Sequence, residues 1–300
     1  MVPILLGVTL LTFMLFNVLM KDPATRFAGK HATAEQVTSI RAELGLDRSL
    51  PQQYVFFLRQ IATFDYGRSW STKQKISTMI DDGFSATLCV TVPPFIIAIF
   101  LSVILAMVAA YRRGSLFDKG VVVTCLAFLS VSSLVYILAL QYGLAYSLGW
   151  FPISGWDPSW TGRWAYLVLP WIILVVLSLG VDILLYRSVI LDESYQDYVR
   201  TARAKGLSGT SVFSRHILKN ALIPIITNIV IEMPFLITGS VLVESFFGIP
   251  GLGGMLVQAL NNSDLPVIKA MTVIISIAYM IFNLLSDILY SYADPRIRLS

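Results

Sequence analysis

Residues 83–111 read GFSATLCVTVPPFIIAIFLSVILAMVAAY and contain no charged side chain. A helix needs about 20 consecutive apolar residues to cross the hydrocarbon core of a bilayer, so this stretch is long enough for one membrane-spanning helix. Residues 1–20 and 120–156 are also free of charged side chains. The sequence therefore predicts an integral membrane protein.

Three later apolar stretches each contain one acidic residue, Asp182, Glu232 or Asp287. With them, six membrane-spanning helices are predicted, at residues 1–20, 83–111, 120–147, 164–186, 221–247 and 266–290. The first stretch could be a secretory signal, but it lacks a basic region and a small-residue cleavage site, so an uncleaved helix is favoured. The expected fold class is an all-α integral membrane protein.

The composition supports lipid as the solvent for much of the surface. Of the 300 residues, 56% are hydrophobic and 13% are charged, whereas a soluble domain carries about a quarter charged residues. The net charge is +4 and the 22 Lys and Arg residues are scattered, which argues against a nucleic-acid partner. Cys89 and Cys125 both fall in apolar stretches, so we expect small buried side chains rather than a disulfide framework or a metal site.

Basic residues favour the cytoplasmic side of a membrane. They gather between the second and third predicted helices, at Arg112, Arg113 and Lys119, and between the fourth and fifth. These loops and both chain termini are therefore predicted to be cytoplasmic. Residues 21–82 then form a small extracytoplasmic subdomain, because loops of about 60 residues or more translocate largely regardless of charge.

Within this subdomain, local patterns predict two short helices. Thr33 favours a helix start and Gly45 a helix end. Residues 54–61 form a second amphipathic stretch. The subdomain is therefore expected to be helical, like the rest of the chain.

The cytoplasmic segment 192–220 is unlike a plain connector. It contains DYVRTARAKGLS at 197–208, followed by HILKNALIP at 216–224. Tyr198, Thr201, Ala202 and Lys205 have helical spacing, so a helix over about 194–205 would place them on one face. The small Ala202 would let a partner approach closely.

The second half of this segment predicts a reversal of the chain. Gly206 is expected to end the first helix in a left-handed conformation, which glycine adopts at little cost. Thr210 or Ser211 can cap a second helix that continues into the fifth membrane-spanning helix. The result would be a helix-turn-helix knob beneath the membrane.

These two motifs resemble the cytoplasmic loop of permease subunits in the dipeptide, oligopeptide and nickel group of ATP-binding-cassette importers. Further similar stretches are LGLD at 44–47, DYGRS at 65–69, FPISGW at 151–156, ESFFGIPGLG at 244–253 and DPR at 294–296. The large external insertion is similar to that of the first of the two permeases in such systems. The resemblance implies a type I importer permease fold with six membrane-spanning helices, in the bacterial cytoplasmic (inner) membrane.

The resemblance also implies that the knob docks into a groove on a cytoplasmic ATPase. The candidate coupling residues are Asp197, Tyr198, Arg200, Ala202, Arg203, Lys205, Gly206, His216, Asn220 and Pro224. Tyr198, Ala202 and Gly206 are expected to provide shape, and the basic residues ionic contacts. Alternatively, the basic residues act only as the signal that sets the orientation in the membrane.

No G-x-x-x-x-G-K-[ST] motif occurs, so we expect nucleotide to bind another polypeptide. The resemblance implies that this chain is not an enzyme and binds no cofactor, while one or two cytoplasmic ATPase subunits use ATP and Mg. The other implied partners are a second homologous permease, an extracytoplasmic solute-binding protein and membrane lipid. His31 and His216 are the only histidines and are predicted on opposite sides of the membrane, which argues against a metal site.

Polar residues inside a bilayer are costly, at about 2.5 to 3.5 kcal/mol for a central Asp, and usually mark functional sites. The candidates for the translocation path and gates are Asn228, Glu232, Asp182 and Glu244. Asn228 and Glu232 form a polar stripe on one helix face. Asp182 could instead pair with Arg187 or lie near the membrane surface, and Glu244 could belong to a tight external turn. Asp287 could equally lie near the membrane surface.

The implied cargo is a dipeptide or oligopeptide, although similar permeases carry nickel chelates, glutathione or oligosaccharides. A secondary transporter often shows two similar halves, which are not apparent here. An intramembrane enzyme would need a nucleophile or metal ligands, and neither HExxH nor GxSxG occurs. The sequence therefore favours an importer permease over both alternatives.

Overall fold

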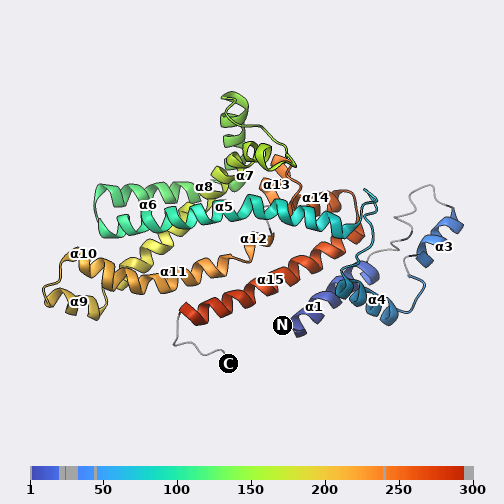
Figure 1. The fold of residues 1–300 in the computed structure, drawn as a ribbon, viewed down its shortest axis with the longest axis horizontal. Coiled ribbons are helices and arrows are strands. Elements are labelled where there is room, and N and C mark those ends of the chain that lie inside the picture. The colour runs from blue at the N-terminus through green and yellow to red at the C-terminus, as the bar shows by residue number, and fades with distance from the viewer. Residues whose placement is uncertain (1, 20–23, 25–32, 44–45, 239–240, 294–300) are drawn as a thin grey trace. The chain divides into compact units, whose positions relative to one another are not determined.

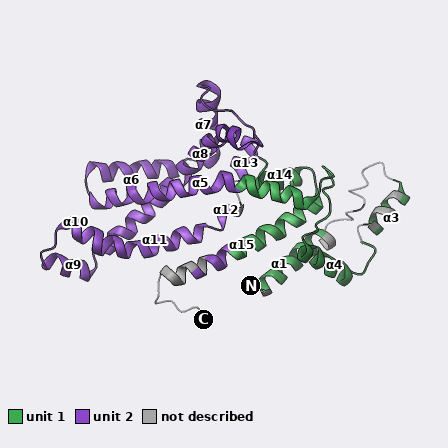
Figure 2. Ribbon diagram, viewed as in Figure 1, with its two compact units in different colours: residues 1–87, 250–281 green, residues 88–249, 282–300 purple. Residues whose placement is uncertain are grey.

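The computed structural model describes residues 2–19, 24, 33–43, 46–238 and 241–293 (Figure 1). These residues form helices and turns, with one isolated bridge between Arg68 and Lys75 and no strand. The all-α fold class is therefore confirmed. The chain divides into two compact units, residues 1–87 with 250–281 and residues 88–249 with 282–300 (Figure 2).

Three helices are long and apolar enough to cross a membrane. They are α5 (Ile76–Tyr111), α8 (Trp160–Ser194) and the part Leu265–Leu285 of α15 (Leu265–Ala293). At 1.5 Å per residue, α5 and α8 are each more than about 50 Å long. Both helices therefore extend well beyond the hydrocarbon core, which is about 30 Å thick.

The remaining apolar helices are shorter or broken. Residues 116–147 form α6 (Leu116–Leu129), α7 (Ser133–Leu140) and the π-helical η2 (Gln141–Ser147), with a bend of 95° after α6. Helices α13 (Val241–Phe247) and α14 (Leu252–Asn261) meet the length criterion only together. The described residues thus contain three to five candidate spans, so the count of six remains a prediction.

The structure divides the stretch predicted as the fifth span. Helix α11 (Lys219–Glu232) ends just before Pro234, and α12 covers Phe235–Thr238. The Met233 N–H bonds the Val230 carbonyl at 3.3 Å, a tighter turn than in an α-helix. Because proline has no N–H to continue the helical ladder, the chain breaks here.

In the first unit, the N-terminal helix packs against the subdomain that the sequence predicts to be external. Helix α1 (Val2–Phe13) continues as the π-helical η1 (Met14–Leu19) and contacts α4 (Leu50–Thr63). The rings of Phe13 and Tyr54 meet edge to face at 5.3 Å, and Thr9 Oγ1 lies 3.0 Å from the Tyr54 hydroxyl. Helix α3 (Ala34–Glu43) begins just after Thr33, whereas Gly45 lies outside the described residues.

The buried carboxylate of Asp264, immediately before α15, binds the loop that precedes α5. Its Oδ2 accepts hydrogen bonds from Ser69 Oγ at 2.5 Å, Ser71 Oγ at 2.8 Å and the Ser71 N–H at 3.1 Å. Its Oδ1 accepts the Trp70 N–H at 3.1 Å. Burial by itself would raise the pKa of Asp264, but these four donors hold it below its usual range. The ionised carboxylate thus joins two segments that are distant in sequence.

In the second unit, α8 is the central helix. It contacts α6, α7 and α11. At the end that carries α9 (Asp197–Ala204), the core contains Tyr186 and Ile190 of α8, with small residues of α5 against them. This core holds the segment that the sequence predicts to couple the chain to an ATPase.

Replacing Asp264 by Asn should lower the stability of the first unit by about 2 kcal/mol, because an amide cannot accept all four hydrogen bonds. A carboxyl with a depressed pKa contributes stability above its unfolded pKa and loses it as the pH falls through the folded pKa. Thermal unfolding of the purified protein should therefore become less pH-dependent in Asp264→Asn between about pH 5 and 2. An unchanged acid profile would contradict this role.

Candidate functional site

The helix-turn-helix knob predicted within residues 192–220 is present, and its turn lies at Gly206. Helix α9 ends at Ala204, and the Gly206 N–H bonds the Arg203 carbonyl at 3.0 Å. Gly206 has φ +78° and open space around the position of a Cβ atom. A glycine is therefore required at position 206 because the backbone is left-handed there, and not because neighbouring atoms pack closely against it.

The second helix of the knob begins earlier than predicted. Ser208 caps α10 (Gly209–Val212), because its Oγ accepts the Ser211 N–H at 3.4 Å. Thr210 and Ser211 lie inside this helix, so the prediction that one of them forms the cap was wrong. The chain then continues through the π-helical η3 (Phe213–Leu218) into α11.

Ala202 packs against this chain itself. Val199 is 0% exposed and Ala202 is 4% exposed. Both belong to a core cluster with Ala106 and Ala110 of α5 and Tyr186 of α8. The close approach that a small residue permits is therefore intramolecular, and Ala202 gives a partner no free surface.

Tyr198 is half-buried beside this core. Its hydroxyl donates a hydrogen bond to the carboxylate of Glu193, the last turn of α8. Burial, together with this carboxylate, raises the pKa of Tyr198. Asn220 of α11 lies close to the same hydroxyl. Tyr198 thus joins α9 to the helices on either side.

The other candidate residues of the knob divide into exposed and half-buried positions. The exposed ones are Asp197, Arg200, Arg203, Lys205, Gly206 and Pro224, and His216 and Asn220 are half-buried. Arg200 and Asp197 form a solvent-exposed ion pair at 3.4 Å, which contributes little stability. Leu207, which sequence reasoning did not single out, is 40% exposed just after the turn. The exposed surface of the knob near its turn therefore combines basic residues with the apolar side chain of Leu207.

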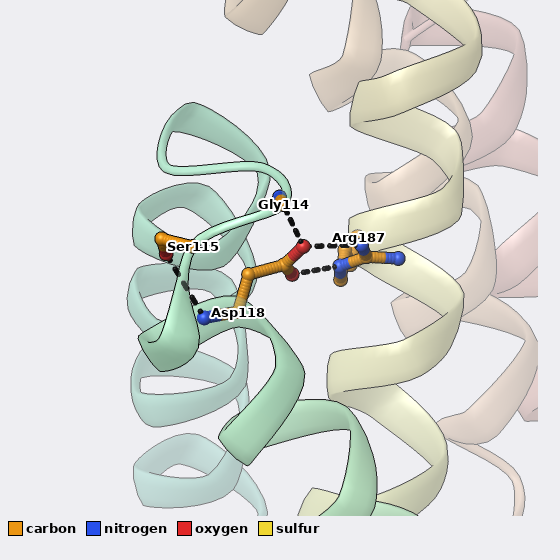
Figure 3. Close-up of polar contacts among 4 residues, drawn as sticks. All are labelled: Gly114, Ser115, Asp118 and Arg187. Carbon is orange, nitrogen blue, oxygen red and sulfur yellow. Dashed lines mark hydrogen bonds and ion pairs between the residues drawn. The ribbon is translucent and has the colours of Figure 1, made fainter.

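An ion pair between the buried Asp118 and the half-buried Arg187 fixes the turn between α5 and α6 to α8 (Figure 3). The Asp118 carboxylate accepts two hydrogen bonds from Arg187, at 2.6 Å from Nε and 2.8 Å from Nη2. It also accepts the Gly114 N–H at 2.9 Å, and Ser115 Oγ caps α6 by accepting the Asp118 N–H at 3.2 Å. The pattern Ser115-x-x-Asp118 before an apolar run is the one sequence signal for this arrangement.

This pair settles one alternative for Asp182. Arg187 is engaged by Asp118 and not by Asp182, so the interpretation of Asp182 and Arg187 as partners was wrong.

The turn between α5 and α6 also contacts the knob on either side of α9. The Tyr111 ring meets the Phe213 ring edge to face at 5.2 Å, and the Arg113 guanidinium lies 5.0 Å from the Tyr195 ring centre. The turn, α8 and the knob are therefore packed together.

The candidate residues of the translocation path gather between α8 and α11, which are in contact. Asp182 is 4% exposed, whereas Asn228 and Glu232 are half-buried. The Asn228 amide donates to Glu232 Oε1 at 2.8 Å. The structure thus brings together three of the four path and gate candidates.

Glu244 lies apart from this group, in α13. Its side chain is fully buried, and its carbonyl accepts the Ile249 N–H at 2.9 Å across Gly248, which has φ +65°. The neighbouring Phe247 carbonyl accepts the Gly155 N–H at 2.8 Å. Glu244 therefore lies inside α13, just before a turn at Gly248. The external position of this turn and the assignment of Glu244 to a gate remain predictions. The side chain of Asp287 lies outside the described residues.

The chain matches two models of transport proteins. The model described as "binding-protein-dependent transport system inner membrane component" matches residues 102–299, and the N-terminal model of such membrane components matches residues 1–91. A peptide transport system permease protein of Brucella abortus (strain 2308) is 40% identical over 302 aligned positions, which cover 99% of this chain and 96% of the relative. The glutathione transport system permease protein GsiC of Salmonella choleraesuis is 33% identical over 298 positions, which cover 99% and 96%.

Removing one side of the Asp118–Arg187 pair should destabilise the second unit by about 3 kcal/mol, because it leaves a buried charge without its partner. We expect Asp118→Ala and Arg187→Ala each to lower the midpoint of thermal unfolding in detergent. The double variant should lose clearly less than the sum of the two single losses.

The exposed Asp192 lies near the end of the same helix, so Asp192→Ala provides the control and should leave the midpoint unchanged. Fully additive losses in the double variant would contradict the coupling between Asp118 and Arg187.

Proposed function

Because the chain belongs to the family of inner membrane components of binding-protein-dependent transport systems, we propose that it forms the translocation path of an ATP-driven peptide importer. It is a multi-pass membrane permease and not a catalytic enzyme in itself. The observation that supports the proposal most is the match over nearly the whole chain, combined with a knob whose outer surface is free. The two candidate cargo classes are peptides and glutathione, after the relatives at 40% and 33% identity.

In this proposal, the knob receives mechanical work from an ATPase subunit. The exposed side of α9 and the turn at Gly206 would lie in the groove of the ATPase, with Arg200, Arg203 and Lys205 as ionic contacts and Leu207 as an apolar contact. The buried side of α9 packs on α5 and α8 through Val199 and Ala202. A displacement of the knob would therefore move these long helices with it, because packed interiors transmit strain.

The remaining partners follow from the family. One or two cytoplasmic ATPase subunits would bind ATP and Mg, and this chain would bind no nucleotide or other cofactor. An external solute-binding protein would deliver the cargo, and a second homologous permease would complete the path. We place the chain in the bacterial cytoplasmic membrane with both termini in the cytoplasm, since the basic turn at 112–119 and the knob then lie on the cytoplasmic side.

Arg203→Glu and Leu207→Asp should reduce ATP-driven peptide uptake at least about tenfold, the scale expected when central contacts of an interface are lost. Both side chains are exposed, so insertion and thermal stability should be unchanged. The measurements are peptide uptake by the complete reconstituted complex and co-purification of the ATPase with the permease.

The matched control is Arg59→Glu, which also reverses an exposed charge, on helix α4 of the proposed external subdomain. Ala202→Arg is unsuitable because it would disturb the core. Normal uptake by both knob variants would overturn the docking surface.

The orientation is tested by single cysteines in a background with Cys89 and Cys125 replaced. A thiol at the exposed Ser214 of η3 should react with an impermeant reagent only after the cytoplasmic face is opened. A thiol at the exposed Thr161, in the first turn of α8, should react in intact cells. The opposite pattern would reverse the topology.

A further inference from the structure

Two packed helices of the second unit each present a pair of polar side chains one turn apart. On α8 these are Asp182 and Tyr186, and on α11 they are Asn228 and Glu232. Residues four apart lie on the same face of a helix. Tyr186 belongs to the core cluster that also contains Ala221 and Ile225 of α11. The four polar side chains therefore gather at the contact between the two helices.

One of these groups is buried without a bonding partner. Tyr186 is 0% exposed, and its hydroxyl makes no hydrogen bond of acceptable geometry among the described residues, although it lies near Asn228. A buried hydroxyl without a hydrogen bond is costly. Asn228 already donates to Glu232 at 2.8 Å. The free hydroxyl points to a ligand that would supply the missing bond.

The cluster contains two carboxyl groups, those of Asp182 on α8 and Glu232 on α11. Asp182 and Glu232 are close enough to repel each other. Arg187, five residues after Asp182, is held by Asp118, and no described group of three His, Cys, Asp or Glu side chains is arranged for a metal ion. Acidic side chains within a membrane usually have a positive partner or mark a transport pathway. An organic cation fits this cluster better than a metal.

We propose that Asp182, Glu232 and Tyr186 bind a primary ammonium group of the cargo as it passes through the permease. An ammonium group has three N–H donors, and the two carboxylates and the phenolic oxygen provide three acceptors. Asn228 positions Glu232. Glu232 and Asn228 are half-buried, whereas Asp182 and Tyr186 are buried, so the cargo would reach the site from the side of Glu232 and Asn228.

This inference rests on the proposed function, because the cargo must carry such a group. Peptides and glutathione, the cargoes named for the relatives, both have a free primary ammonium group. The site therefore explains how one architecture accepts both classes. It also predicts that N-acetylation of a peptide, which removes the positive charge, abolishes recognition by this cluster.

The transport test uses the complete complex in proteoliposomes, with trialanine and N-acetyl-trialanine as probes. Uptake is divided by the amount of binding protein loaded with each peptide. A difference in the affinity of the binding protein for the two peptides then does not affect the comparison. Asp182→Asn and Glu232→Gln should lower trialanine uptake about tenfold or more, the loss expected for a buried charge pair. Uptake of the acetylated probe should stay the same in all variants. The exposed Glu35 provides the control Glu35→Gln, which should resemble the wild type.

Tyr186→Phe separates a ligand-binding role from a structural one. Because the hydroxyl has no hydrogen bond in the described structure, its removal should not lower the thermal unfolding midpoint. It should still lower trialanine uptake several-fold. A lower midpoint with equal losses for both probes would show a structural role and would overturn the site.

A second measurement does not depend on transport. A hydrophobic carbodiimide modifies carboxyl groups in apolar surroundings, and mass spectrometry locates the label. Trialanine and glutathione should protect Asp182 or Glu232 from labelling, whereas N-acetyl-trialanine should not. If trialanine does not protect the carboxyl groups from labelling, the ammonium site is overturned, even where the wild type takes up trialanine. If trialanine protects them but is not taken up, only the proposed peptide transport is contradicted.

Discussion

Lipid offers no hydrogen bonds to a peptide group, and this constraint underlies most of the structure. Each backbone N–H and C=O in the membrane needs a partner within the protein, which favours helices. Where the helical ladder is interrupted, as after Met233, the neighbouring residues form tighter bonds within the chain. The long helices α5 and α8 are the direct result. Each is longer than the hydrocarbon core is thick, so its ends reach the aqueous phase.

The knob is stable because its inner face is part of the same core as these helices. Val199 and Ala202 pack among residues of α5, α8 and α11, and Tyr198 bonds the last turn of α8. The Asp118–Arg187 pair fastens the neighbouring turn to α8. A knob attached by a flexible hinge would absorb a displacement, whereas one that shares its core with two long helices passes the displacement on.

The buried charges serve two different purposes. Asp118 accepts three hydrogen bonds and Asp264 accepts four from donors of the chain, so they hold segments together. The cluster of Asp182 and Glu232 instead places two carboxyl groups beside the Tyr186 hydroxyl, which has no hydrogen-bond partner among the described residues. Buried polar groups with all their hydrogen bonds formed make one conformation rigid. A buried hydroxyl without a hydrogen bond can instead form one with a ligand.

The sequence by itself determined the membrane environment, the all-α fold and the left-handed turn at Gly206, because lack of charge and glycine chemistry are local properties. Helical spacing also placed Tyr198 and Ala202 near one another on α9. Only the tertiary structure decided that Ala202 faces the chain's own core and that Arg187 pairs with Asp118 and not with Asp182. Periodicity shows which residues share a face, but the partner of that face depends on how distant segments pack, as with Asp118 and Arg187, which are 69 residues apart.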